Sequence, residues 1–293
     1  KLYMNIKNPL CFLTSILLFS VACAQNQKQE KTIKTGIEVL KINDFDILKG
    51  KKVGLITNAT GLSSALKPTI DILYEAENVE LVALYGPEHG ARGEIAAGDK
   101  VDDYVDPVTQ VPVYSLYGKT RKPTKEMLEN VDVLVYDIQD IGVRSYTYIS
   151  TMGLAMEAAA EHDIDFVVLD RPNPLGGNKI EGNIAEEGYF SFVSQYPIPY
   201  VYGMTPGEVA ILINEEGWLG EGKKVNLTVV EMEGWNRSMT FEETGLQWVP
   251  TSPHIPHANS AYFYVSTGIM GELGVFSEGV GYTLPFQVFA AEW

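Results

Sequence analysis

The sequence contains very little cysteine. Its two cysteines, Cys11 and Cys23, both lie within the first 23 of the 293 residues. The part of the chain that follows them can therefore form no internal disulfide and offers no thiol nucleophile. These two absences exclude a disulfide-stapled scaffold and a cysteine-based hydrolase.

Positive charge is also scarce, because 22 Lys and Arg residues stand against 38 Asp and Glu residues, and the formal net charge is −16. Proteins that bind nucleic acids need a basic surface to neutralise phosphates, so nucleic acid is excluded as a partner. Apolar residues make up 45% of the chain and charged residues 20%, which is a globular composition. The five arginines are Arg92, Arg121, Arg144, Arg171 and Arg237.

Several motifs of common enzyme classes are absent. There is no phosphate-binding P-loop, and no G-x-G-x-x-G follows the first predicted strand. Gly61 and Gly176-Gly177 are isolated turn signals. No G-x-S-x-G motif is present either, so a serine hydrolase would need an unusual nucleophile. Nucleotide chemistry and ordinary serine hydrolysis are therefore poorly supported.

The N-terminus has the pattern of an export signal. An apolar run over residues 10–22 follows a basic start and is too short to span a bilayer. Residues 20–23 resemble a lipobox that would leave a lipidated cysteine, whereas residues 22–24 also fit a signal-peptidase site. We expect residues 1–23 to direct export and residues 24–35 to form a polar tether. The protein would be periplasmic or anchored to the cell envelope by a lipid, and an uncleaved anchor is a third alternative.

Short apolar runs alternate with helical patterns from residue 36 to residue 235. The expected strands cover residues 52–57, 79–85, 111–116, 131–136, 165–169 and 225–230. The expected helices cover residues 69–75, 124–129, 146–161 and 206–216, the last one opened by a capping box at residues 205–208. Continuous apolar strands separated by helices predict an α/β fold, a Rossmann-like and mainly parallel sheet covered by helices on both faces.

The pattern becomes irregular and aromatic after about residue 235. We expect residues 236–293 to form an irregular segment that completes a cleft and leads into a smaller C-terminal domain. The sequence ends without a terminating signal, as a truncated gene product would.

Acidic residues follow three of the predicted strands. Glu88, Asp137 with Asp140, and Asp170 come directly after apolar runs. Three arginines follow the same strand ends, at Arg92, Arg144 and Arg171. Because parallel strands share one carboxyl edge, these side chains are predicted to line a crevice where ligands bind. The alternative is that each acid caps a helix or braces a loop.

The turn Gly86-Pro87-Glu88-His89-Gly90 places a carboxyl group beside an imidazole between two glycines. Glutamate and histidine are the usual groups for proton transfer in catalysis. We therefore predict Glu88 as a general acid/base with His89 as its neighbour, and Asp137 or Asp140 as the charge partner. His89 could instead orient a neighbouring group through a hydrogen bond.

A metal site is a further alternative, because His254 and His257 could approach the acidic residues. Pro256 between them argues against a pair of ligands on one helix, so we assign no metal and no cofactor. The 16 tyrosines include alternating pairs at residues 146/148, 200/202 and 262/264. Such pairs indicate one face of a strand or loop, or aromatic platforms for sugar rings.

Long motifs at residues 54–61, 84–99, 135–153, 169–183 and 196–210 resemble the DUF1343 family. The resemblance runs from about residue 36 to residue 289. Characterised members are exo-β-N-acetylmuramidases of the NamZ type. The resemblance implies a Rossmann-like domain, a smaller C-terminal domain and a site in the cleft between them.

The activity implied by this resemblance is release of terminal N-acetylmuramic acid (MurNAc) from the non-reducing end of peptidoglycan fragments. Such a reaction needs an acid for the leaving oxygen, and an arginine to bind the lactyl carboxylate of MurNAc. We expect at least one of Arg92, Arg144 and Arg171 to bind that carboxylate. The alternatives are a metal-dependent hydrolase that uses His89, and a cell-wall lipoprotein that binds sugars without turnover.

The predicted site has two groups of residues. The catalytic group is Glu88, His89, Asp137 and Asp140. The substrate-binding group is Asn58, Arg92, Arg144, Tyr146, Asp170, Arg171, Asn173, Glu181, His257 and Glu278.

Overall fold

The computed structural model describes residues 32–93 and 102–291. The predicted export signal and most of the predicted tether lie outside the described residues. The last tether residues do not match the expectation, because Ile33 and Thr35 are buried. Lys34 also pairs with Glu233 at 2.6 Å. Burial of Ile33 fixes this stretch to the folded body, so the polar tether cannot extend to residue 35.

A seven-stranded sheet forms the centre of the fold, in the order β3-β4-β2-β1-β5-β6-β9. All neighbouring strands are parallel except for β3 and β4. The strands are β1 Lys52–Thr57, β2 Glu80–Gly86, β3 Tyr104–Val105, β4 Pro112–Ser115, β5 Val133–Asp137, β6 Asp165–Leu169 and β9 Leu227–Val230. The predicted α/β architecture with a mainly parallel sheet is confirmed.

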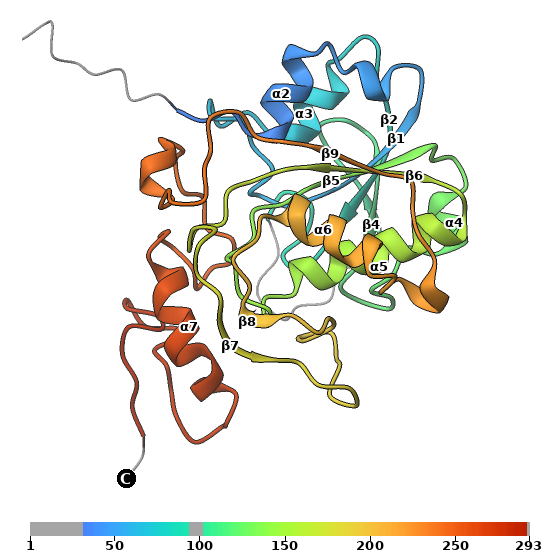
Figure 1. The fold of residues 1–293 in the computed structure, drawn as a ribbon. Helices are drawn as coiled ribbons and strands as arrows, with labels where there is room; N and C mark the ends of the chain where they lie inside the picture. The colour runs from blue at the N-terminus through green and yellow to red at the C-terminus, as the bar shows by residue number, and fades with distance from the viewer. Residues whose placement is uncertain (1–31, 94–101, 292–293) are drawn as a thin grey trace, which may run out of the picture. The chain divides into compact units, whose positions relative to one another are not determined.

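Helices cover both faces of this sheet, as Figure 1 shows, with α2 and α3 on one face and α5 and α6 on the other. The helices are α2 Gly36–Ile42, α3 Thr69–Tyr74, α4 Lys125–Leu128, α5 Tyr148–Glu161, α6 Pro206–Glu215 and α7 Ser260–Gly271. Short 3₁₀ turns lie at η1 Asp46–Leu48, η2 Gly220–Gly222 and η3 Glu242–Thr244. None of the helices in these described stretches is long and apolar enough to cross a membrane.

Alternate residues of each central strand enter different cores. In β1, Leu55 packs with the α2 and α3 side, whereas Ile56 packs with the α5 and α6 side. In β5, Val135 and Tyr136 divide in the same way. Since both faces are buried, these strands are apolar throughout, which is why their positions could be predicted from the sequence.

The start of α6 also follows the sequence prediction. Thr205 accepts a hydrogen bond from the backbone of Glu208 at 3.3 Å, and the Glu208 carboxylate accepts one from the backbone of Thr205 at 3.0 Å. This reciprocal pair satisfies backbone donors that a helix N-terminus otherwise leaves open. Pro206 occupies the first helical position, where its missing N–H is harmless.

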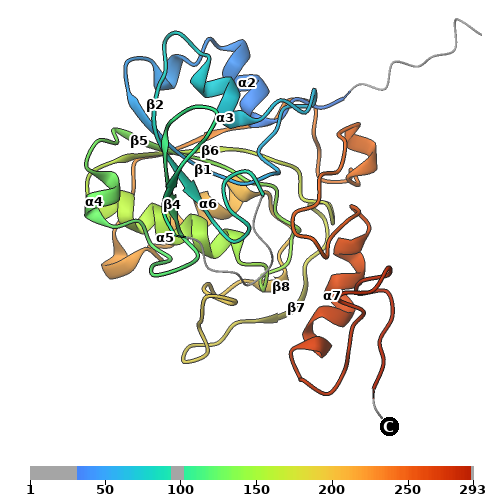
Figure 2. The same ribbon diagram turned by 180° about the vertical axis from the view of Figure 1, so that it is seen from behind.

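A third apolar cluster lies beyond the carboxyl edge of the sheet. It contains Ile141 and Val143 after β5, Tyr200 and Val201 of the β7–β8 hairpin, and Ala261 of α7. The hairpin is antiparallel, with β7 at Glu181–Ile184 and β8 at Pro199–Val201. Figure 2 shows the hairpin and α7 from the opposite side.

The expectation of an irregular segment over residues 236–293 is wrong for α7, which has 12 residues. Its sequence is apolar on most sides, so no polar face reveals a helical period. Burial of Ser260 and Ala261 against the third cluster fixes the helix instead. Residues 236–291 belong to the same compact unit as the sheet.

Candidate active site

A polar pocket of about 160 Å³ opens near the carboxyl end of β2. Its walls come from the turn after β2, the segment leading into α5, the loop before α7, and α7 itself. The lining residues are Glu88, His89, Ser145, Tyr146, Thr147, Tyr148, Ser252 and Tyr264. Of the predicted site residues, the structure therefore brings Glu88, His89 and Tyr146 together.

The turn that carries Glu88 has an unusual backbone. His89 is buried and has a φ of +76°, a conformation that side chains other than glycine seldom adopt. Gly86 must be a glycine, because a Cβ there would lie 2.9 Å from the backbone nitrogen of Ala91. Strained backbone of this kind persists when the surrounding structure holds it, and it is common at active sites. The turn thus presents Glu88, which is half-buried, to the pocket.

Tyrosine hydroxyl groups hold the opposite wall in place. Tyr146 donates a hydrogen bond to the Thr251 side chain at 2.8 Å, and Tyr148 donates one to the Thr251 carbonyl at 2.6 Å. The rings of Tyr146 and Tyr264 meet edge to face with centroids 5.9 Å apart. Burial raises the pKa of Tyr264 to about 12, so this hydroxyl stays protonated at neutral pH. The wall combines flat apolar surface with fixed hydroxyls, as sugar-binding sites require.

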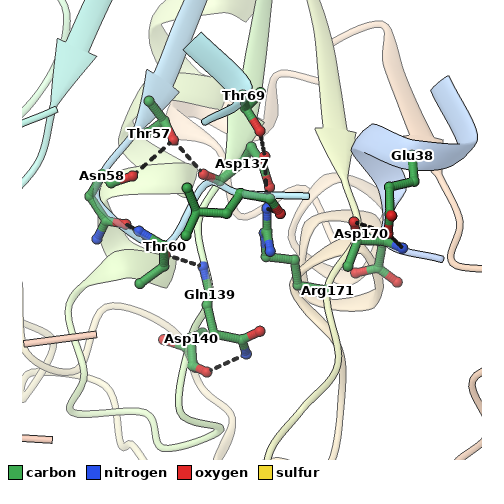
Figure 3. A network of polar contacts seen from close by, with 12 residues as sticks. Glu38, Thr57, Asn58, Thr60, Thr69, Asp137, Gln139, Asp140, Asp170 and Arg171 are labelled. Atoms are coloured by element: carbon green, nitrogen blue, oxygen red, sulfur yellow. Dashed lines mark hydrogen bonds and ion pairs between the residues drawn. The ribbon is translucent and has the colours of Figure 1, made fainter. Parts of the chain in front are cut away.

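Asp137 does not line this pocket. It is fully buried and accepts hydrogen bonds from Arg171 at 2.5 and 2.9 Å and from Thr69 at 2.5 Å. Figure 3 shows this network beside the end of β1. With its oxygens engaged, Asp137 acts as a structural anchor between β5, β6 and α3, and this geometry does not support its predicted role as the charge partner of Glu88.

Asp140 also lies away from the pocket lining, fully buried behind it. One carboxylate oxygen accepts hydrogen bonds from Tyr202 and, at 2.7 Å, from the backbone of Gly142. The other oxygen has no hydrogen-bond partner among the described residues. Burial raises the pKa of Asp140 to about 7, because an ionised carboxylate would be poorly solvated there.

The raised pKa of Asp140 makes stability depend on pH. Between about pH 4 and pH 7 the unfolded chain loses this proton while the folded chain keeps it, so stability falls as pH rises, by at most about 1.4 kcal/mol per pH unit. Above pH 7 the contribution levels off. Asp140→Asn should lack this pH dependence. In urea unfolding between pH 4 and pH 8, the free energy of unfolding of the variant should therefore rise relative to that of wild type. If the free energy of unfolding changes with pH in the same way for both proteins, the raised pKa of Asp140 is contradicted.

Asp170 has a structural role as well. It accepts hydrogen bonds from the Thr205 hydroxyl and the Gly207 backbone, both at 2.8 Å, at the N-terminus of α6. Burial raises its pKa to about 6. The interpretation of a strand-end acid as a helix cap therefore applies to Asp170.

The three arginines predicted to bind a carboxylate already have partners in the protein. Arg92 pairs with Asp71 and Asp106, at 2.8 and 2.6 Å. Arg171 pairs with Asp137, as described above. Arg144 donates hydrogen bonds to the carbonyls of Asn183 and Ile198, at 2.7 and 2.5 Å. Their geometry argues against the expectation that one of them binds the substrate.

Two predicted asparagines shape loops near the sheet edge. Asn58 accepts hydrogen bonds from the backbone and hydroxyl of Thr60, at 2.9 and 2.6 Å, and also contacts Tyr148 in the pocket wall. Asn173 ties its loop to the Met204 carbonyl at 2.9 Å. Both side chains are buried, so they support the site from outside the pocket.

The remaining predicted residues lie outside the pocket lining. Glu181 is exposed on β7, and His257 is exposed before α7. Glu278 is half-buried beside Gly271 at the end of α7. Within the described ranges, no three His, Cys, Asp or Glu side chains gather closely enough to hold a metal ion.

Sequence reasoning missed several pocket residues. Ser145, Ser252 and Tyr264 line the pocket. Burial and the nearby Glu88 carboxylate raise the pKa of Tyr117, so Tyr117 lies close to Glu88. Tyr117 follows β4, whose carboxyl end lies at the same edge as that of β2. The rule that located Glu88 could therefore have located Tyr117. Ser252 and Tyr264 carried no such signal, because they come from a segment without a predicted element.

The profile of the family described as "Exo-beta-N-acetylmuramidase NamZ, N-terminal" matches residues 53–259. The peptidoglycan beta-N-acetylmuramidase NamZ of Bacillus subtilis (strain 168) is 50% identical, over 97% of this chain and 70% of that protein.

Two crystal structures of DUF1343 family proteins from Bacteroides fragilis are similar in fold. The first has a TM-score of 0.84 and 64% identity, and covers 89% of this chain. The second has a TM-score of 0.77 and 37% identity, and covers 88% of this chain. The chain matches 66% of each solved chain, slightly less than two thirds of their length.

Proposed function

This chain belongs to the DUF1343 family of NamZ-type proteins, and on that premise we propose that it is an exo-acting β-N-acetylmuramidase. Its substrate is a peptidoglycan fragment that carries β-linked MurNAc at the non-reducing end. The reaction is hydrolysis of that terminal glycosidic bond, which releases free MurNAc. The relative from Bacillus subtilis is named a peptidoglycan beta-N-acetylmuramidase, and the matching family is described as an exo-beta-N-acetylmuramidase.

The observation that carries this proposal is the position of Glu88. It is a carboxyl group in a pocket with an aromatic and hydroxyl-bearing wall, held by a strained turn at the carboxyl edge of the sheet. A sugar ring placed against Tyr146 and Tyr264 would bring its glycosidic oxygen towards this carboxyl group. The volume of about 160 Å³ suits one sugar ring, in agreement with removal of a single terminal residue.

In the proposed reaction, Glu88 gives its proton to the leaving oxygen as the bond from that oxygen to the anomeric carbon breaks. A water molecule then supplies the hydroxyl group at the anomeric carbon and returns a proton to Glu88. His89 and Tyr117 hold the position of the Glu88 carboxyl group in this scheme. The closeness of Tyr117 to Glu88 supports that role.

We propose that neither predicted aspartate is the second catalytic group. Asp137 and Asp140 are buried and lie outside the pocket lining, which argues against contact with the anomeric carbon. In some glycosidase families the acetamido group of the substrate takes this role. We infer that the acetamido oxygen of MurNAc bonds to the anomeric carbon as the leaving oxygen departs, and that the attacking water molecule then breaks this new bond and restores the acetamido group.

We place this activity in the cell envelope, on the pattern of residues 1–23. The N-terminal segment fits export followed by either lipid attachment or cleavage to a periplasmic form. Peptidoglycan fragments are released in that compartment, so enzyme and substrate would meet there.

A chromogenic substrate pair tests the proposal. The protein should release the chromophore from a β-MurNAc glycoside much faster than from the matching β-N-acetylglucosamine (GlcNAc) glycoside. Because the scheme uses no metal ion, EDTA should leave the rate unchanged. Loss of activity with EDTA would favour the metal-dependent hydrolase, and binding of MurNAc without turnover would favour the sugar-binding protein.

A further inference from the structure

Arg121 differs from the other four arginines in its surroundings. Arg92 and Arg171 are ion-paired with aspartates, Arg237 is ion-paired with Glu208, and Arg144 binds backbone carbonyls. Arg121 is exposed, and within the described residues its guanidinium has neither a hydrogen bond nor an ion pair. In a chain with a net charge of −16, an arginine without an acidic partner is available for an acidic ligand.

Arg121 lies at the edge of the candidate active site. It belongs to the loop between β4 and α4, four residues after Tyr117. Burial and the negative charge of Glu88 raise the pKa of Tyr117, and the positive charge of Arg121 opposes this shift. The guanidinium is therefore close enough to act electrostatically on the tyrosine that lies close to Glu88.

A stacking contact holds the guanidinium in place. Its central carbon lies 4.1 Å from the ring centroid of Phe192, which belongs to the loop between β7 and β8. Stacking occupies the flat face of a guanidinium and leaves the N–H groups on its edge available. That edge matches the two oxygens of a carboxylate, and such a paired contact is among the stronger hydrogen-bonded interactions.

MurNAc and GlcNAc differ only in the lactyl ether on MurNAc, which ends in a carboxylate. We propose that Arg121 binds this lactyl carboxylate, and that it is the residue that makes the pocket select MurNAc over GlcNAc. This inference rests on the proposed function. It replaces Arg92, Arg144 and Arg171, which acceptors of the protein itself hold in place, with an arginine that has no such acceptor among the described residues.

The test compares Arg121→Ala with wild type on three chromogenic glycosides, those of MurNAc, of its lactyl methyl ester, and of GlcNAc. Loss of a hydrogen bond to a charged group should lower kcat/KM for MurNAc by about 10- to 150-fold. The values for the neutral ester and for GlcNAc should change little. Wild type should prefer the acid over the ester, and the variant should lose that preference.

Two further variants separate recognition from general effects. Lys119→Ala removes a positive charge from the same loop, where Lys119 is exposed and pairs with Asp102 at 3.2 Å, and it should keep the preference for the acid. Arg121→Lys should recover part of the MurNAc activity because it restores the charge. An equal loss on all three glycosides in Arg121→Ala would overturn the proposal and make Arg121 a structural brace on Phe192.

If the proposed hydrolase function is wrong, the same experiments give a different pattern of results. If wild type hydrolyses none of the glycosides, equilibrium binding of free MurNAc and GlcNAc to wild type and Arg121→Ala decides the role of Arg121. Selective weakening of MurNAc binding in the variant would support the assignment. Equal affinities of the variant and wild type for MurNAc would overturn it.

Discussion

Replacement of Glu88 by Gln is expected to lower kcat on a β-MurNAc glycoside by about 10²- to 10⁴-fold, the usual contribution of general acid catalysis. Glutamine keeps the size of the side chain and its capacity to form hydrogen bonds, but it has no acidic proton to transfer. Substrate binding should therefore survive. The loss should be larger for a sugar leaving group than for an activated phenol, which departs without protonation.

The matched control is Glu80→Gln, at the other end of the same strand. Glu80 is exposed at the start of β2 and should tolerate the same change without loss of rate. Steady-state kinetics on the two leaving groups provide the measurement. If Glu88→Gln hydrolyses both substrates at nearly the wild-type rate, Glu88 is a loop residue and the acid must be found elsewhere.

Replacement of Arg171 by Met should destabilise the fold by about 3–5 kcal/mol, because it leaves the buried Asp137 carboxylate without its counterion. Asp137 is completely inaccessible and Arg171 is 4% exposed, so water cannot compensate. Methionine approximates the length of the lost side chain and limits the cavity. Urea unfolding followed by circular dichroism measures the effect.

A double variant separates charge from shape. Asp137→Asn combined with Arg171→Met removes both charges and should be more stable than Arg171→Met alone. Lys224→Ala is the control for an exposed pair, since Lys224 and Glu215 are 52% and 63% exposed, and it should change stability by at most about 1 kcal/mol. A similar small loss for Arg171→Met would show that the buried pair is not an anchor.

The sheet and its edge could be predicted because they follow from local pattern. Strands such as β1 and β6 are buried on both faces, so their apolar runs are continuous and their parallel order follows from the helices between them. That order placed Glu88 and His89 at the correct edge. The helix α7 could not be predicted, because its position depends on contacts with β8 and the loop after β5.

The role of each polar residue at this edge of the sheet could not be predicted from its residue type. Asp137, Asp140 and Asp170 all follow strands, yet one pairs with arginine, one is buried with tyrosine and one caps a helix. Burial and partner choice decide between these roles, and both are set by residues distant in sequence, such as Thr69, Tyr202 and Thr205. For the same reason, the sequence alone predicts a ligand as the partner of the arginines near the strand ends. In the structure, acceptor groups of the protein itself hold these arginines.

Product analysis on a natural linkage tests the proposed activity most directly. The protein is incubated with two peptidoglycan disaccharides, one ending in MurNAc and one ending in GlcNAc at the non-reducing end, and the products are identified by mass spectrometry. We predict free MurNAc from the first disaccharide, no cleavage of the second, and at least about 100-fold slower release of MurNAc from the first with Glu88→Gln. Cleavage of both disaccharides at similar rates, or of neither by the wild-type protein, would contradict the proposed activity.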